Sequence, residues 1–252
     1  PTASRRTMVR IMEPMLKAVA DLPGVGGRKQ HDRPRLEQAV DPGEWIRLLG
    51  HDRVIVDGDC AVGVRLESGE EVMADIVIGN VGPKLLYERL IAPAELPADF
   101  LRRIRSFKAG SGTFRMNVAL TALPSFSCLP GEGEHLQSGI IIAPTLDYMD
   151  QAFLDARQSG MSQAPIVEML IPSIVDDSLA PPGRHVASLF CQQFAPVLPG
   201  GRSWDEEREA AADRIIDTVE AYAPGFRAAV VGRQIHSPLD LERKFGLVGG
   251  DI

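Results

Sequence analysis

The sequence predicts an α+β fold, in which a β-meander precedes a mostly antiparallel sheet with helices packed on one face. Between residues 110 and 237 about five strand-like segments occur, and the helical segments are grouped between them rather than strictly alternating with them. Residues 53–78 contain short strand-like segments joined by tight-turn sequences. Of 252 residues, 44% are hydrophobic and 24% are charged, which is ordinary for a chain that buries a core.

The first 35 residues carry a helical pattern followed by a glycine-rich, basic stretch. Residues 4–21 place Met8, Ile11 and Leu16 at helical spacing, which predicts a core-facing helix. Residues 22–35 hold three glycines and four basic side chains, so one interpretation is a phosphate-binding loop. The dinucleotide fingerprint, however, requires GxGxxG directly after a strand. A solvated loop is therefore the favoured interpretation of this stretch.

A meander is expected next. Residues 54–56 predict a short strand, and the dipeptide Asp57-Gly58 is typical of a tight hairpin turn because glycine tolerates positive φ. Residues 61–66 alternate apolar and polar side chains, as a half-buried strand does. Residues 72–78 are almost continuously apolar, which predicts one strand buried on both faces.

The remaining elements follow from periodicity and turn residues. Helices are expected over 83–90 and 97–107, and the proline-flanked loop between them is a plausible domain boundary. The pattern Ser203-x-x-Glu206 predicts a capping box at the start of the next-to-last helix. Strands are expected over 113–120, 139–143, 166–171 and 186–194, an apolar–polar segment over 233–237, and helices over 145–158, 204–223 and, as a single turn, 240–243.

Composition argues against several classes of function. The net charge of −7 and the pI near 5.3 disfavour a nucleic-acid partner or an anionic membrane surface. No apolar run approaches the roughly 20 residues of a membrane span, so no transmembrane segment is expected. Cys60, Cys128 and Cys191 lie far apart without a CxxC motif, and we expect reduced interior thiols. The five histidines lack metal-ligand spacing, so no metal site is predicted.

A few residues are candidates for binding. Arg115 and Asn117 occupy the polar face of the strand predicted over 113–120, where they either orient a polar group of a substrate or solubilise the surface. His236 is expected to be a hydrogen-bonded structural residue. Gly249 and Gly250 follow the last helical turn, where a glycine pair lets the backbone turn sharply or approach another group closely.

Several long motifs occur in the order found in a known family. They are AVGVRLESGEEVMADIVIGNVGP, SGTFRMNVALTALPSF, PIVEMLIPSIVDDSLAPPGRHVASLF, GGRSWDEEREAAADRIIDTVEAYAPGF and SPLDLERKFGLVGGDI. Together they span roughly residues 53–252. The chain resembles the phytoene-dehydrogenase-like FAD/NAD(P) oxidoreductases, and within them the branch called pyridine nucleotide-disulfide oxidoreductase domain-containing protein 2.

The resemblance implies a division into two domains. Residues 1–92 would be part of a Rossmann-like FAD-binding domain, and residues 93–252 a substrate domain whose glycine-rich end returns to the FAD domain. FAD would be the cofactor, with NAD(P) as a second candidate, and the substrate would be a small apolar molecule. The activity would be that of a dehydrogenase or desaturase, and the compartment the cytoplasm or, alternatively, the mitochondrial matrix.

The same resemblance assigns expected site residues. The backbone around Val54 would lie beside the adenine end of FAD, and the strand ending at Asn80 would end near the cofactor. Gly249 and Gly250 would let the backbone approach the flavin ring. Arg115 and Asn117 would be the candidates for substrate contact. The sequence does not identify the catalytic residues.

The sequence also departs from the family. It contains no strand–GxGxxG–helix motif, residues 29–48 do not match the family pattern, and the family's later histidine and flavin-facing segment do not occur before Ile252. The chain as given is therefore expected to be catalytically inactive by itself. An alternative from another class stays open, namely a non-catalytic binding module that keeps the substrate-domain fold.

Overall fold

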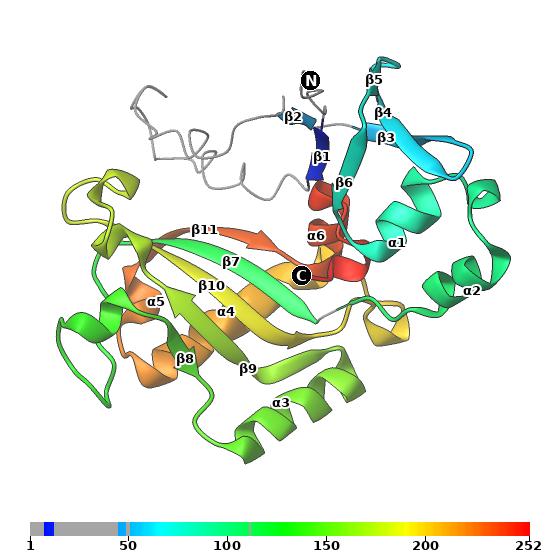
Figure 1. Cartoon of the computed structure of the whole chain (residues 1–252). Coiled ribbons are helices and arrows are strands. Elements are labelled where there is room, and N and C mark those ends of the chain that lie inside the picture. Colours follow the sequence, from blue (N-terminus) through cyan, green and yellow to red (C-terminus); the bar gives the residue numbers. More distant parts are fainter. Residues whose placement is uncertain (1–7, 13–44, 49–50, 111) are drawn as a thin grey trace. The chain divides into compact units, whose positions relative to one another are not determined.

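A computed structural model describes residues 8–12, 45–48, 51–110 and 112–252 (Figure 1). Contacts divide the described chain into two units. The first unit holds residues 8–12, 45–48, 51–109 and 245–248, and the second holds residue 110, residues 112–244 and residues 249–252. The assignment of residues 1–92 to a cofactor domain and of 93–252 to a substrate domain stays a prediction.

The first unit contains the predicted meander. Its strands β3 (His51–Asp57), β4 (Cys60–Leu66) and β5 (Glu71–Met73) form an antiparallel sheet in chain order. Gly58 has φ 58° and Gly69 has φ 86°, so both turns use the left-handed conformation that glycine adopts without strain. The short strands expected over 54–56 and 61–66 are confirmed, and β3 is more than twice as long as predicted.

A second, parallel sheet of the first unit was not expected. Strands β2 (Trp45–Leu48), β1 (Met8–Met12) and β6 (Ile76–Asn80) pair in that order. The helix predicted over 4–21 is therefore wrong at Met8–Met12, because pairing with segments more than 30 residues away overrides a local apolar period. The rest of that predicted helix and the whole 22–35 loop lie outside the described residues.

The strand predicted over 72–78 is also wrong, because it is two strands in different sheets. Ala74 and Asp75 separate β5 from β6, and the amide of Ala74 donates to Val62 O at 2.8 Å. The side chains of β6 are half-buried rather than buried on both faces, and its last two residues are exposed. A continuous apolar run does not show where a chain changes its pairing partner.

Both helices predicted for this part of the chain are present. Residues 83–90 form one α-helical turn, α1 (Pro83–Leu85), continued by the wider turn η2 (Leu86–Leu90). A 3₁₀ turn, η3 (Pro93–Glu95), leads into α2 (Ala98–Ser106). The small core of this unit is built on Val54, Val64, Ala74 and Leu90.

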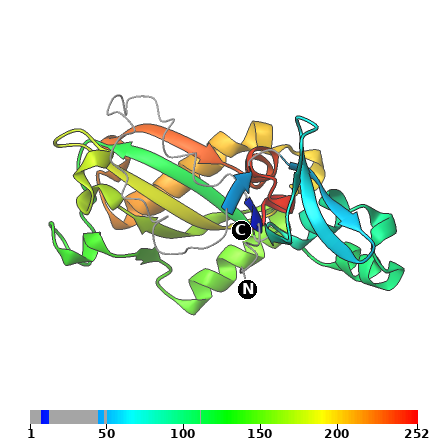
Figure 2. The ribbon, with the colours of Figure 1, turned by 45° about the horizontal axis from the view of Figure 1, so that its top comes forward.

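The second unit is organised around one five-stranded sheet in which every pairing is antiparallel (Figures 1 and 2). The strand order is β11-β7-β10-β9-β8. This confirms the mostly antiparallel sheet expected between residues 110 and 237. The strands are β7 (Thr113–Leu120), β8 (Ile140–Ile142), β9 (Met161–Leu170), β10 (His185–Phe194) and β11 (Val230–His236).

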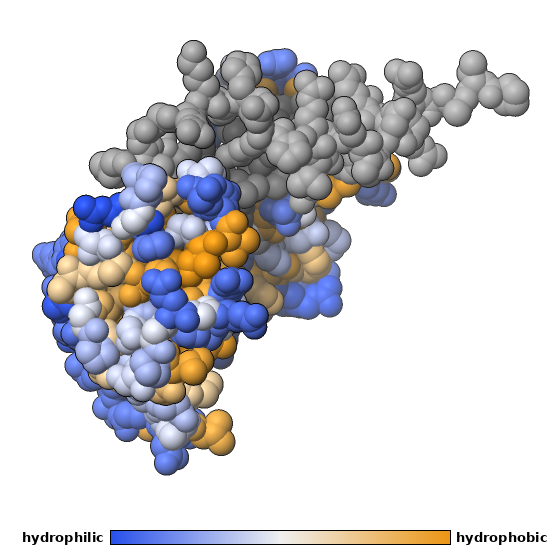
Figure 3. All heavy atoms as spheres, turned by 90° about the vertical axis from the view of Figure 1, so that its left-hand side faces the viewer, coloured by the Kyte–Doolittle hydropathy of each residue, from blue (hydrophilic) through white to orange (hydrophobic). Residues whose placement is uncertain are grey.

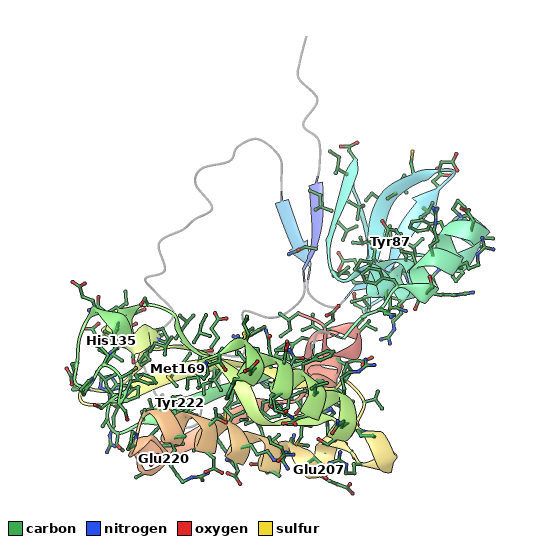
Figure 4. All side chains as sticks on the ribbon, turned by 90° about the horizontal axis from the view of Figure 1, so that it is seen from below. Tyr87, His135, Met169, Glu207, Glu220 and Tyr222 are labelled. Carbon is green, nitrogen blue, oxygen red and sulfur yellow. The ribbon has the colours of Figure 1, made fainter. Side chains whose placement is uncertain are left out.

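The helices of this unit agree with the predicted periodicity. The long helix α4 (Trp204–Tyr222) runs along the sheet in Figures 1 and 2, and α3 (Leu146–Ser159) packs beside β9. Figure 4 places Glu207 and Glu220 near opposite ends of α4. The shorter helices are α5 (Phe226–Ala229) and α6 (Pro238–Phe245), and the 3₁₀ turns are η4 (Glu134–Gln137), η5 (Pro172–Ile174), η6 (Asp177–Leu179), η7 (Pro199–Gly201) and η8 (Val248–Gly250). Phe245 at the end of α6 and Val248 at the start of η8 belong to the first unit.

The main core lies between α4 and one face of the sheet. Phe114, Met116, Val118 and Leu120 alternate along β7 and are at most 1% exposed, and they join the buried face of α4 in one apolar cluster. Burying such a continuous apolar surface is the main favourable term in folding. Because side chains alternate along a strand, the residues between these four point to the opposite face of the sheet.

The start of α4 differs in detail from the predicted capping box. Ser203 is the N-cap, and its hydroxyl oxygen accepts from the amide of Asp205 at 3.1 Å. The amide of Glu206, which was expected to bond that side chain, donates instead to the carbonyl of Ser203 at 3.1 Å. The helix therefore begins at the predicted residue, but its N-cap hydroxyl accepts from the amide of Asp205 rather than from that of Glu206.

The burial of the three cysteines differs in part from the prediction. Cys191 is buried as expected, but Cys60 and Cys128 are exposed, so the prediction of three interior thiols is wrong for those two. Turn positions explain the difference, because Cys60 follows the hairpin turn and Cys128 lies in a surface loop.

Within the described part of the chain, no helix is both long and apolar enough to cross a bilayer.

Candidate functional site

The face of the five-stranded sheet opposite α4 carries a row of side chains that crosses every strand. By register, His236 on β11 pairs with Arg115 on β7, Arg115 with Phe190 on β10, Phe190 with Glu168 on β9, and Glu168 with Ile141 on β8. Directly paired residues of antiparallel strands point to the same face. We call these five residues the cross-strand row.

Arg115 lies near the middle of the row and is half-buried. Its guanidinium carbon lies 5.1 Å from the centre of the Phe190 ring, a cation–π distance. Its Nη2 atom donates to the hydroxyl of Ser188 at 3.5 Å, which is a long contact. Burial lowers the pKa of Arg115, against the opposing influence of Cys191 and Glu168.

Arg115 forms no ion pair within the described chain. No carboxylate oxygen of the described residues lies within 4.0 Å of its guanidinium nitrogens. By contrast Arg233, on the other face, holds both Asp213 and Glu209 at 2.6 Å. A half-buried cation without a paired anion is costly unless another group compensates it.

A second row beside the first continues the same face. Gln234 on β11 pairs with Asn117 on β7, Asn117 with Ser188 on β10, and Ser188 with Leu170 on β9. The Gln234 Oε1 atom is buried and has no hydrogen-bond partner among the residues that the structure describes. The predicted candidates Arg115 and Asn117 therefore share this half-buried face, and their contact with a substrate stays a prediction.

The face changes character from one edge to the other. Over β11 and β7 it presents imidazole, guanidinium and amide groups. Towards β9 and β8 it presents large apolar side chains, with Leu170 exposed by 49% and Ile141 by 65%. A combination of an apolar wall with a few polar groups is typical of small-molecule sites. Another side of the second unit, seen in Figure 3, also shows apolar residues interspersed with hydrophilic ones, so exposed apolar side chains are not confined to one face.

The C-terminal end of β11 is tied to α6 by a buried carboxylate. Asp240 accepts from the amide of Ser237 at 3.1 Å and from its hydroxyl at 2.9 Å, while the Asp240 amide donates to the Ser237 hydroxyl at 3.2 Å. This reciprocal arrangement is a capping box. Burial alone would raise the pKa of Asp240, but these hydrogen bonds and the charges of Lys244 and Arg208 outweigh it and lower the pKa.

His236 has the structural surroundings that the sequence predicted. It is 6% exposed, and its Nδ1 atom lies 3.4 Å from Lys244 Nζ. Burial and then the Lys244 charge lower the pKa of His236, with Asp240 opposing and Arg115 adding to the decrease. The imidazole beside Arg115 is therefore neutral at pH 7.

The glycine pair is required by packing within the chain. A Cβ on Gly250, which has φ 67°, would lie 2.5 Å from Pro238 O, and the amide of Gly249 donates to Glu242 at 3.1 Å. A Cβ on Gly110 would lie 3.5 Å from Gly249 O, so this tail packs beside the segment that leads into β7. The close approach seen is to Pro238 within the chain, and the role of the pair towards a flavin stays a prediction.

The other two predicted cofactor residues lie in the first unit. The side chain of Val54 is buried in the core, so only its backbone could serve a ligand. β3 is an edge strand, so half of its backbone groups point away from β4. Asn80 is exposed at the carboxyl end of a parallel strand, the end at which α/β sheets bind ligands. The roles of Val54 and Asn80 towards a cofactor stay predictions.

No metal centre emerges from the described residues, which contain no group of three or more His, Cys, Asp or Glu side chains arranged to hold an ion. The sequence named Arg115 and Asn117 as candidates but did not indicate Phe190, Glu168 and Gln234 as their neighbours on this face. That neighbourhood depends on strand register, which local periodicity does not reveal.

The chain is similar to known oxidoreductases over most of its length. It is 40% identical over 199 residues to pyridine nucleotide-disulfide oxidoreductase domain-containing protein 2 of Mus musculus, covering 76% of this chain and 34% of that protein. The protein of the same description from Rattus norvegicus is 40% identical over 197 residues, covering 75% and 34%. The chain thus spans about a third of the length of these relatives.

More distant similarity was also found. The chloroplastic prolycopene isomerase of Daucus carota is 25% identical over 204 residues, covering 79% of this chain and 30% of that protein. No protein-family model matches the chain. An oxidoreductase structure from Methanosarcina mazei has a TM-score of 0.49 at 15% identity, with 77% and 38% coverage, and a reduced UDP-galactopyranose mutase has 0.44 at 13%, with 74% and 33%.

Proposed function

The chain is related in sequence to pyridine nucleotide-disulfide oxidoreductase domain-containing protein 2, and on this premise we propose that it forms part of an FAD-dependent oxidoreductase acting on an apolar small molecule. The reaction would be of the dehydrogenase or desaturase type. In the complete protein the five-stranded sheet would be one wall of the substrate cavity, and the first unit would belong to the cofactor domain.

The observation that carries this proposal is the half-buried face of the sheet. A sheet face that only meets water is covered by short polar and charged side chains. This face instead combines a half-buried arginine over a phenylalanine ring, a buried amide oxygen without a partner, and two large exposed apolar residues, Leu170 and Ile141. These groups suit a cavity wall that orients one polar group and shelters an apolar body.

FAD, when bound, supplies the hydride transfer itself, while the protein contributes position and electrostatics. The outward backbone of β3 near Val54 and the exposed Asn80 would hold the cofactor in the first unit. Gly249 and Gly250 would contribute backbone in the second. NAD(P) is a second candidate as redox partner.

The chain's own side chains would bind and orient the substrate. Arg115 and Asn117 would fix the polar end, and Phe190 would exclude water from the centre of the sheet. Neutral His236 would hold its hydrogen-bonding position without adding a charge beside Arg115. No residue of the chain is assigned a proton-transfer step.

Absorbance spectroscopy tests the proposal. Protein expressed from its complete reading frame, incubated with FAD and desalted, is expected to keep a flavin band near ~450 nm that bleaches with substrate. The 252-residue chain alone is expected to be colourless, because its sequence lacks a strand–GxGxxG–helix motif. A folded, colourless complete protein would overturn the proposal in favour of the non-catalytic binding module.

A variant pair tests the predicted cofactor residue. Asn80→Ala in the complete protein is expected to weaken flavin retention, since it removes a polar group at the strand end. Gln163→Ala removes another exposed amide, on β9 of the second unit, and is the matched control. Equal flavin retention by both variants would contradict a role for Asn80.

A further inference from the structure

We infer that the face of the five-stranded sheet opposite α4 binds a carboxylate. The substrate is then an apolar molecule with one carboxylate group, which Arg115 binds. This inference rests on the proposed function in placing the substrate on this face, and it deepens that function by naming the polar end. Arg115 is suited to the task because guanidinium presents a planar fork of donors that matches the two oxygens of a carboxylate.

The donors of Arg115 are largely unused. A guanidinium has five N–H groups, and within the described part of the chain Arg115 makes one 3.5 Å contact to Ser188 and stacks on the Phe190 ring. Stacking fixes the plane of the guanidinium while leaving its edge available for hydrogen bonds. A carboxylate approaching that edge would satisfy the donors and compensate the half-buried charge.

The surrounding charges favour a monoanion. Along the cross-strand row Arg115 is positive, His236 is neutral at pH 7, and Glu168 is negative and exposed. Lys244, beside His236, has an ion-pair partner in Asp240 at 3.9 Å, a carboxylate that it shares with Arg208. One cation without an ion-pair partner in the described chain matches one carboxylate, whereas a phosphate dianion would call for a second free cation.

Amide groups can complete the polar end. Asn117 follows Arg115 by two residues on the same strand face, and Gln234 is its partner on β11. The buried Gln234 Oε1 atom lacks a partner among the described residues, and rotation of the amide would exchange this oxygen for a donor. Either orientation gives a carboxylate or its conjugate acid a hydrogen-bonding neighbour.

The apolar body would extend from Arg115 across the strands. Phe190 lies next to Arg115 in the row, and Ile141, exposed by 65%, ends that row at the strand edge. Leu170, exposed by 49%, ends the neighbouring row. Covering these side chains with a hydrocarbon chain removes apolar surface from water on both partners.

Calorimetric titration of the 252-residue chain with decanoate and with decan-1-ol tests the inference. Decanoate is expected to bind at least about tenfold more tightly than the alcohol, as a charged hydrogen bond predicts. The variant Arg115→Met is expected to abolish this difference, and Arg115→Lys to keep part of it. Equal affinities in the wild-type chain, or no binding of decanoate to the folded chain, would overturn the inference.

A matched control comes from another stacked arginine. Arg157 lies over Phe153 on α3 at 5.9 Å from the ring centre, but it is exposed. Arg157→Met is therefore expected to leave the preference for decanoate unchanged. If it removes the preference as Arg115→Met does, the effect is not specific to the sheet face and the inference fails.

A second readout does not depend on the folding of a variant. In the wild-type chain, the Arg115 side-chain Nε–Hε NMR signal is expected to shift on addition of decanoate but not of decan-1-ol. An unshifted signal at saturating decanoate would contradict the inference. Flavin retention is measured separately. A colourless complete protein that still binds decanoate would contradict the proposed oxidoreductase activity but would support the carboxylate site.

Discussion

Asp240 shows how one buried carboxylate can hold two elements together. It caps α6 through Ser237, and its Oδ1 atom lies 3.3 Å from Arg208 on α4. Its side chain is only 8% exposed, so these contacts are weakly screened. The end of β11, and with it His236 in the cross-strand row, is thereby fixed to the main helix.

Asp240→Asn is expected to lower the free energy of unfolding by about 2 kcal/mol at pH 7, because charge-assisted hydrogen bonds are lost. The pKa of Asp240 is lower in the folded chain, so its contribution is complete above the unfolded-state pKa of about 3.9 and is lost as the pH falls through the folded-state pKa. Urea unfolding at pH 7 and pH 3 checks both statements.

The control for that measurement is Asp99→Asn, which removes an exposed carboxylate 3.2 Å from Arg103 on α2. Its expected effect is below about 0.5 kcal/mol. If the difference in unfolding free energy between wild type and Asp240→Asn stays constant down to pH 3, ionisation of Asp240 does not contribute to stability.

Gly250→Ala is expected to destabilise the chain more than Gly183→Ala. Both glycines have positive φ, 67° and 70°, so both substitutions incur a conformational cost of roughly 1–2 kcal/mol. Only at Gly250 does the new Cβ also meet backbone, 2.5 Å from Pro238 O, whereas at Gly183 nothing lies within 4 Å. Equal shifts in the urea midpoint would contradict the packing role of Gly250.

Within single strands and helices, the local hydrophobic pattern predicted which side chains share one face. The alternation along β7 correctly separated Phe114 and Met116 from Arg115 and Asn117. The same reasoning failed for β1, because its strand form depends on parallel partners at Trp45–Leu48 and Ile76–Asn80. Apolar residues mark burial, but the pairing partner decides between strand and helix when the segment is short.

The N-cap of α4 provides a test at this scale. Ser203→Ala removes the acceptor of the Asp205 amide and is expected to cost about 1 kcal/mol of stability. Ser203→Asp keeps an acceptor and is expected to retain most of that stability. Thermal unfolding followed by circular dichroism measures both, and an alanine variant as stable as wild type would show that water replaces the cap.

At the scale of the whole chain, the described residues contain two separate apolar clusters. One is built on Val54 and Val64 in the first unit, and the larger one contains Val118 and the buried face of α4 in the second. Each unit is therefore stabilised mainly by its own core. The free energy of local opening is therefore expected to depend, in each unit, mainly on that unit's own apolar cluster.

Hydrogen exchange of two matched variants tests the division. Val64→Ala and Val118→Ala each remove two methyl groups from a residue that is 0% exposed, at an expected cost of about 2 kcal/mol. Val64→Ala is expected to lower amide protection in β3 and β4, and Val118→Ala in β7 and β10. Equal loss of protection in both units after either change would show a single cooperative body.

The alternation of β7, the meander turns at Gly58 and Gly69, the span of α4 and the similarity to oxidoreductases could all be predicted from the sequence alone. These depend on neighbours within a few residues or on motif order. The position of Arg115 between His236 and Phe190, and the division of residues 72–78 between two sheets, became evident only from the folded chain. Strand register joins residues far apart in the chain, and a one-residue slip would exchange the two faces.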